Sequence, residues 1–177
     1  SASLEHPGIL VQHGPILKVV FGPRDPSYIS PILSTIQSDL CESGIDGVLS
    51  THIQRDALEK FSYVSPIGAA GVYLHAVAGD FQKEGPARDL FKSMIREIST
   101  LAAAMGYPFE KDYVKINLEI LSNLSADATT SMQRDIMEGK PSELDGLVME
   151  PLRLAKKYSV SMPCYKEVAK VLCPSEF

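Results

Sequence analysis

Residues Ile53–Tyr73, IQRDALEKFSYVSPIGAAGVY, mark a change in the character of the chain. Apolar or small residues recur at positions 53, 57, 64, 67 and 71, which is the spacing of one face of an α-helix. Pro66 interrupts the segment, and we expect a bend there because its ring removes a backbone hydrogen bond. The stretch therefore predicts a long helix, and with it the beginning of a helical domain.

Every later segment has the same helical character. We expect helices at about 86–105, 110–123, 129–138, 143–157 and 163–172. Pro86 suits a first helical turn, and Gly106 and Gly139 suit helix ends. Ser142 with Asp145 three places later is an acidic variant of the capping box. Residues 52–177 are therefore predicted to form an all-helical domain.

The residues before this domain alternate between strand and helix. β-prone runs at 9–11 and 16–21 precede a helical pattern over 29–43, and a last strand is expected at 47–51. Such a β-β-α-β tail would leave its sheet edges exposed unless more of the sheet existed elsewhere. We therefore expect residues 1–51 to be the remnant of a larger α/β sheet domain, and the chain as a whole to be mainly α.

Composition excludes several classes of function. Of the 177 residues, 17 are Lys or Arg and 22 are Asp or Glu, and this net charge of −5 argues against nucleic-acid binding. The most apolar run, Ile67–Gly79, is too short to cross a bilayer. Cys41, Cys164 and Cys173 form no Cys-x-x-Cys pair, which predicts free thiols, and the histidines show no metal-ligand spacing. We expect a cytoplasmic protein with no metal, membrane or nucleic-acid partner.

Lys60 is the first residue with a candidate chemical role. At 100° per residue from Ile53 it falls at about 340°, between Val64 at about 20° and Ile67 at about 320°. An ammonium group in such an apolar stripe either reaches water along its stem or is desolvated beside a partner. In the second case desolvation lowers the pKa of the amine and makes it a usable proton donor.

A second candidate cluster lies between residues 129 and 145. Ser131 and Asp135 are four apart on one helix face, so that a hydroxyl and a carboxylate stand near each other. Glu143 falls in the first turn of the next expected helix, where backbone donors favour a carboxylate. The same pattern is also compatible with a capped helix-turn-helix that has a solvated acidic rim.

Several motifs together resemble the ketopantoate reductase family. Residues 131–136, SMQRDI, followed by 139–147, GKPSELDGL, are similar to a signature of that family. Residues 155–163 resemble its small-residue helix and the turn that follows, and residues 53–61 resemble the helix that bears its catalytic lysine. Residues 12–22 are similar to the strands that close its nucleotide-binding domain, so the resemblance covers nearly the whole chain in order.

The resemblance implies that residues 52–177 form a helical substrate-binding and dimerisation domain of the 6-phosphogluconate-dehydrogenase-like type. It also implies that residues 1–51 are the C-terminal end of a truncated nucleotide-binding domain of the Rossmann type. It also implies an NADPH-dependent 2-keto acid reductase, of the kind that makes pantoate from ketopantoate in pantothenate biosynthesis. Lys60 would be the general acid, Ser131 would hold the substrate carboxylate, and Glu143 would hydrogen-bond the substrate hydroxyl and the cofactor ribose. Asp135 would support these residues without contacting the substrate.

Two features depart from the family pattern. The family places asparagines four and eight residues after the lysine, and here these positions are Val64 and Gly68. The chain also has no G-x-G-x-x-G loop, which in such reductases holds the pyrophosphate of the cofactor. We therefore expect the C-terminal part of a longer reductase, which binds NADP(H) only when full length and is inactive as this fragment.

Two other functions are compatible with the sequence. The chain could be a helical dimerisation or interaction domain of a divergent family member, because Val64 and Gly68 replace polar contacts. A hydroxyacid dehydrogenase with a helical second domain is a more distant alternative, against which the spacing from Ser131 to Glu143 argues.

Overall fold

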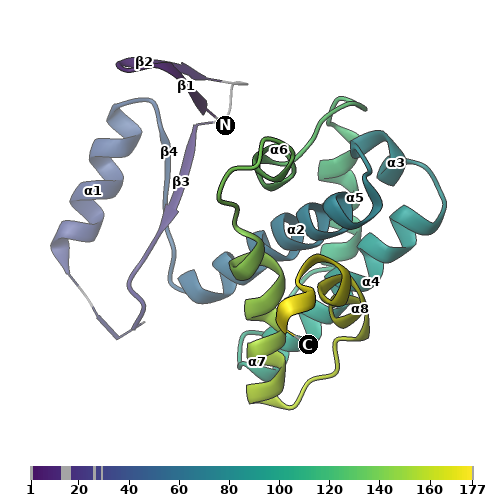
Figure 1. Ribbon diagram of the computed structural model, residues 1–177. Coiled ribbons are helices and arrows are strands. Elements are labelled where there is room, and N and C mark those ends of the chain that lie inside the picture. The colour runs from purple at the N-terminus through teal and green to yellow at the C-terminus, as the bar shows by residue number, and fades with distance from the viewer. Residues whose placement is uncertain (1, 13–16, 26, 29, 177) are drawn as a thin grey trace. The chain divides into compact units, whose positions relative to one another are not determined.

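The computed structural model describes residues 2–12, 17–25, 27–28 and 30–176, and it is shown in Figure 1. The chain divides into two compact units, Ser1–Asp56 and Ala57–Phe177. The first unit combines strands with one helix. Among the described residues of the second unit, helices are the only regular elements. This arrangement confirms the mainly α fold with a small β-containing remnant before the helices.

The first unit contains two separate pairs of strands. Strands β1 (Ala2–His6) and β2 (Ile9–Gln12) form an antiparallel hairpin. Strand β3 (Lys18–Phe21) pairs in parallel with β4 (Asp46–Leu49), and helix α1 (Pro31–Glu42) connects them. Strand β1 was not expected, because its residues form no apolar run of the kind that indicates a strand. It is stabilised by pairing with β2. The expected strand and helix limits at Ile16 and Ile29 fall outside the described residues.

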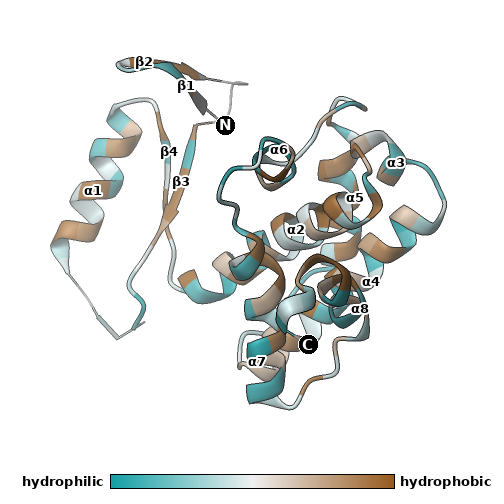
Figure 2. Cartoon of the chain, in the orientation of Figure 1, coloured by the Kyte–Doolittle hydropathy of each residue, from teal (hydrophilic) through white to brown (hydrophobic). Residues whose placement is uncertain are grey.

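Helix α1 covers the β3–β4 pair at Gly47. The side-chain amide of Gln37 donates to the carbonyl of Gly47 at 3.0 Å, and a Cβ at this position would lie 2.9 Å from the Cβ of Leu40. Glycine therefore permits the close packing of helix on strand. Val19 and Val20 of β3 each remain 40% exposed, and the strand is drawn largely in the brown of hydrophobic residues in Figure 2. A two-stranded sheet leaves apolar surface uncovered, as expected for so small a sheet.

The second unit is an assembly of helices, and Figure 1 shows α2 near its middle. Its elements are α2 (Ile53–Leu74, which begins in the first unit), α3 (Ala78–Gln82), α4 (Pro86–Ala104), α5 (Tyr113–Ser122), α6 (Ser131–Met137), the π-helix η1 (Asp145–Met149), α7 (Glu150–Tyr158), α8 (Pro163–Leu172) and the 3₁₀-helix η2 (Pro174–Glu176). Each helix expected from the sequence is present, the one expected at 143–157 as η1 followed by α7, and α3 and η2 are additional.

Two helix starts differ from the expected ones. Helix α5 begins at Tyr113 rather than near 110, because the carboxylate of Asp112 accepts hydrogen bonds from the backbone N–H groups of Val114 and Lys115. The expected capping box of Ser142 and Asp145 does not form. Leu144 is the N-cap of η1, without a side-chain cap, and a π-turn precedes α7.

The core of the second unit surrounds the second half of α2. All seven residues from 65 to 71 are buried, so this part of the helix is enclosed on every side. Phe91, Met94 and Ile95 of α4 and Tyr165 of α8 are fully buried around it. The helix therefore forms a fixed central element from which other segments can be positioned.

Candidate active site

Lys60 lies on α2 before the helix enters the core. The residue is exposed, as is Ala57 one turn earlier, and Val64 one turn later is half-buried. Lys60 makes no hydrogen bond or ion pair with any residue that the structure describes. The apolar stripe of α2 is thus buried only from position 65 onward, and the lysine reaches solvent instead of being desolvated in this chain.

Ser131 is the first residue of α6 and is exposed. The helix starts here because the hydroxyl of Thr130 accepts from the N–H of Gln133, while the side-chain oxygen of Gln133 accepts from the N–H of Thr130 at 2.9 Å. Asp135, one turn after Ser131, is half-buried. The two residues share a face of α6, but among the described residues no hydrogen bond joins their side chains.

Gln133 fixes α6 to the end of α2. Its side-chain amide donates to the carbonyl of Ala76 at 2.7 Å, and the residue is buried. A Cβ at Gly71 would lie 2.7 Å from the amide carbon of Gln133, so a larger residue would displace this side chain. Gly71 therefore leaves the space in which Gln133 joins α6 to α2.

Gly68 faces the beginning of α6. A Cβ at this position would lie 3.1 Å from the terminal methyl of Met132 and 3.9 Å from the hydroxyl oxygen of Thr130. The place of the family's second asparagine is thus next to the segment that carries Ser131, and the methyl group of Met132 approaches it instead. An apolar contact between α2 and α6 replaces the polar group that the resemblance would put there.

Glu143 is exposed and lies just before η1. Its backbone carbonyl accepts from the N–H of Leu147 at 2.9 Å. The carbonyl of Leu147 in turn accepts from the hydroxyl of Ser65 on α2 at 2.6 Å. The backbone at Glu143 is therefore connected to α2 through one intervening residue.

The candidate residues share α2 as a common support. Lys60 belongs to this helix, the segment with Ser131 packs on it at positions 68 and 71, and the segment with Glu143 is bonded to it at Ser65. No hydrogen bond or ion pair joins the side chains of Lys60, Ser131 and Glu143 within the described chain. The structure connects the three segments through α2, and Lys60, Ser131 and Glu143 are all exposed.

A buried polar network at α2 was not foreseen from the sequence. Ser62, Ser65, Asn117 and Tyr165 are all buried and hydrogen-bonded. The available signal was Pro66, because a proline inside a helix leaves the carbonyl four residues earlier without its N–H partner. That carbonyl belongs to Ser62, and the side-chain amide of Asn117 donates to it at 3.1 Å.

A cavity of about 320 Å³ opens beside α6, away from these candidates. Its walls are Gly71, Val72, His75, Ala76, Val77, Thr129, Gln133, Ile136 and Met137. None of Lys60, Ser131, Asp135 and Glu143 lines it. The cavity is largely aliphatic and lies behind the face of α6 that carries Ser131.

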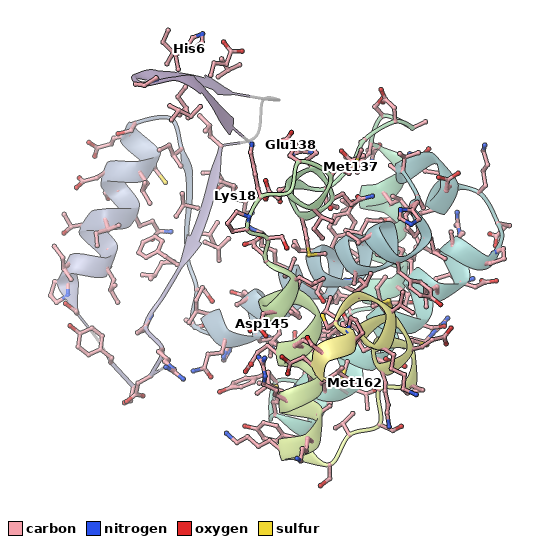
Figure 3. The ribbon with its side chains drawn as sticks, viewed as in Figure 1. His6, Lys18, Met137, Glu138, Asp145 and Met162 are labelled. Atoms are coloured by element: carbon pink, nitrogen blue, oxygen red, sulfur yellow. The ribbon has the colours of Figure 1, made fainter. Side chains whose placement is uncertain are left out.

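The surface near Glu143 carries several charges. Asp145 and Glu150 both accept hydrogen bonds from the guanidinium of Arg153, which lowers the pKa of Asp145. Figure 3 labels Asp145 at η1, and Met137 and Glu138 at the end of α6. Within the described part of the chain no group of three or more metal-ligating side chains occurs, and no helix is long and apolar enough to span a membrane.

The fold of this chain is similar to several solved structures. The 2-dehydropantoate 2-reductase of Methylococcus capsulatus superimposes with a TM-score of 0.86 at 21% identity, over 99% of this chain and 56% of that one. The corresponding enzyme of Geobacter metallireducens gives 0.85 at 21% identity, over 99% and 58%. A D-mandelate dehydrogenase solved with NADH and anilino(oxo)acetate gives 0.82 at 19% identity, over 99% and 57%. This chain thus has the fold of part of these reductases, and it spans little more than half their length.

The sequence itself identifies the family. The family described as "Ketopantoate reductase PanE/ApbA C terminal" matches residues 52–174. The chain belongs to this family, as its motifs indicated. No curated protein sequence matches the chain.

Proposed function

We propose that this chain is the C-terminal part of an NADPH-dependent reductase of a 2-keto acid, of which ketopantoate is the first candidate substrate. The observation that carries the proposal is the common support of three family-matched segments on α2, at Lys60, at Ser65 and at Gly68 and Gly71. Family membership supports the class of reaction, and the packing on α2 supports the assignment of these residues to one site.

Each residue has a distinct role in the proposed reaction. Ser131 holds the substrate carboxylate through its exposed hydroxyl, and Glu143 accepts hydrogen bonds from the substrate hydroxyl and the cofactor ribose. Lys60 donates a proton to the carbonyl oxygen, which becomes the hydroxyl of the product. Asp135 supports the segment of Ser131 from behind.

The cofactor assigned here is NADP(H), which when bound supplies a hydride to the keto carbon. The exposed carboxylate of Glu143 fits a ribose hydroxyl, because an ionised carboxylate only accepts hydrogen bonds. The Gly-rich loop that would hold the pyrophosphate is not part of this sequence. The activity therefore belongs to a complete reductase, which we place in the cytoplasm in keeping with the three free cysteines.

The decisive experiment replaces Lys60 by alanine in the complete reductase, with the nucleotide-binding domain present. Oxidation of NADPH is followed by absorbance with a panel of 2-keto acids that includes ketopantoate. We expect Lys60→Ala to abolish reduction while NADPH binding is unchanged, and Lys111→Ala, another exposed lysine, to leave both unaffected. Full activity of Lys60→Ala would refute the assignment.

A second candidate function is dimerisation through the helical unit. Met137 is 82% exposed and Val171 is 59% exposed, so these two apolar side chains are available for contact with a second copy. One solved relative, from Staphylococcus aureus, is described as a dimeric ketopantoate reductase. Sedimentation of the chain against Met137→Glu and Val171→Glu variants tests this function, and a monomer at all concentrations would contradict it.

A further inference from the structure

Leu147 lies in the π-helix η1 just before α7, and the N–H that an α-helix would offer to its carbonyl is absent. In an α-helix the carbonyl would accept from the N–H four residues later, and that residue is Pro151, which has no N–H. The hydroxyl of Ser65 donates to this carbonyl at 2.6 Å from a position 82 residues earlier. Because Ser65 is fully buried, the bond forms away from water, where an unpaired carbonyl is costly.

Tyr165 extends this contact to a third helix. Its hydroxyl oxygen lies 2.5 Å from that of Ser65, and both residues are fully buried. Because the single proton of Ser65 is donated to the Leu147 carbonyl, the phenol must donate to the serine oxygen. Burial raises the pKa of Tyr165, which keeps this donor protonated.

Leu147 links α2 to Glu143 through hydrogen bonds to both. Its N–H donates to the carbonyl of Glu143, its own carbonyl accepts from Ser65, and its side chain lies 3.9 Å from the Cβ position of Gly68. We propose that Ser65, with Tyr165 behind it, is a positioning residue that sets the place of Glu143 relative to the helix of Lys60. This inference rests on the proposed function, because Glu143 acts there on substrate and cofactor.

The first test compares two serines of α2 in the complete reductase. Ser65→Ala removes the donor to Leu147, and Ser62→Ala is the matched control. Ser62 is equally buried on the same helix. Its hydroxyl donates to the carbonyl of Glu59 within α2 and accepts from the side-chain amide of Asn117 on α5, and neither bond reaches Leu147. We expect Ser65→Ala to lower kcat/KM for the 2-keto acid by about ten- to a hundredfold, the effect of a small displacement in an active site. Ser62→Ala should lower it less than about threefold.

The second test asks whether the loss passes through Glu143. If Ser65 only positions Glu143, then Ser65→Ala causes no further loss of kcat/KM once Glu143→Ala is present. Equal losses in both backgrounds would overturn the inference. Tyr165→Phe, which removes one hydroxyl and keeps the ring, should give a smaller loss with the same dependence on Glu143. If Ser65→Ala does not fold, Tyr165→Phe is used instead to measure how the loss of kcat/KM depends on Glu143.

The third test separates positioning from simple stabilisation. Pro151→Ala supplies an N–H four residues after Leu147, which is the α-helical donor for its carbonyl, but it does not restore a link to α2. In a Ser65→Ala background it should therefore restore the urea midpoint without restoring kcat/KM. Recovery of both quantities would show that Ser65 only satisfies a buried carbonyl, and would overturn the inference.

The outcome for Lys60→Ala keeps the two proposals apart. If Lys60→Ala retains full activity, the proposed function fails whatever the serine variants do. If Lys60→Ala is inactive and Ser65→Ala behaves like Ser62→Ala, only the positioning inference fails. Unchanged kcat/KM in Glu143→Ala would likewise refute the positioning role while leaving that of Lys60 intact.

Discussion

The side-chain amide of Asn117 on α5 donates to the backbone carbonyl of Ser62 on α2 at 3.1 Å. This carbonyl is the one that Pro66 leaves without a helical partner, and the same amide also contacts the hydroxyl of Ser62. Helix α2 therefore continues through its internal proline from Ile53 to Leu74, because another helix supplies the lost donor. The pairing of Ser65 with Leu147 repeats this solution at Pro151.

We predict that Asn117→Ala destabilises the helical unit by about 1–3 kcal/mol, because a buried carbonyl loses its donor. The cost should be smaller in a Pro66→Ala background, where residue 66 regains an N–H for the carbonyl of Ser62. Urea unfolding of the unchanged chain, the two single variants and the double variant measures the coupling free energy between the two positions, which we expect to be about 1 kcal/mol. Asn123→Ala, which alters an exposed amide at the end of the same helix, is the control and should change stability by no more than about 0.5 kcal/mol.

The two glycines of α2 that face α6 should respond differently to alanine. At Gly71 a Cβ would lie within 2.7 Å of the buried amide of Gln133, and overpacking of this kind costs about 1–3 kcal/mol. At Gly68 the nearest atom is the flexible end of Met132 at 3.1 Å, and the helix gains about 1 kcal/mol from alanine. Thermal unfolding should show Gly71→Ala as destabilised and Gly68→Ala as neutral or slightly stabilised. Equal effects of the two variants would contradict the close docking of α6.

Ser131→Ala should weaken binding of the substrate more than it slows the chemical step. A hydroxyl that donates to a carboxylate contributes about 1.5–3 kcal/mol, so KM for the 2-keto acid should rise at least about tenfold in the complete reductase. In contrast, Lys60→Ala should act on kcat. Steady-state kinetics of both variants check this division, with Ser122→Ala as an exposed serine of the same unit for control. A normal KM in Ser131→Ala would exclude its role in holding the carboxylate.

The buried Tyr165 predicts a loss of stability in alkaline solution. Its pKa is raised in the folded state by burial, while in the unfolded chain it titrates near the ordinary value of about 10. Below pH 10 both states keep the proton; above it only the unfolded state loses the proton. The free energy of unfolding then falls with pH, by up to about 1.4 kcal/mol per pH unit from this group.

Tyr165→Phe should remove this contribution. Its free energy of unfolding, measured in urea, is expected to be lower than that of the unchanged chain at pH 8 and to fall less steeply between pH 10 and 11. Identical slopes for the two proteins would mean that the phenol ionises as readily in the folded state as in the unfolded one.

The sequence predicted the elements that depend on local patterns. Apolar spacing over 53–73 and the helix signals at Pro86 and Gly106 gave helices that the structure contains, because periodicity and capping act within a few residues. The start of α5 and the π-turn before α7 were missed. Asp112 caps α5, so the helix begins three residues after the expected start near 110, and Pro151 follows a turn with π-helical hydrogen bonding.

The sequence alone determined the family of this protein and the identity of its candidate residues, since both are carried by short motifs whose order is readable along the chain. The tertiary structure alone decided that Lys60 is exposed and that the segments of Ser131 and Glu143 pack on its helix. The donors that satisfy the carbonyls of Ser62 and Leu147 lie 55 and 82 positions away. Contacts over such separations depend on how whole helices pack, and no local pattern encodes them.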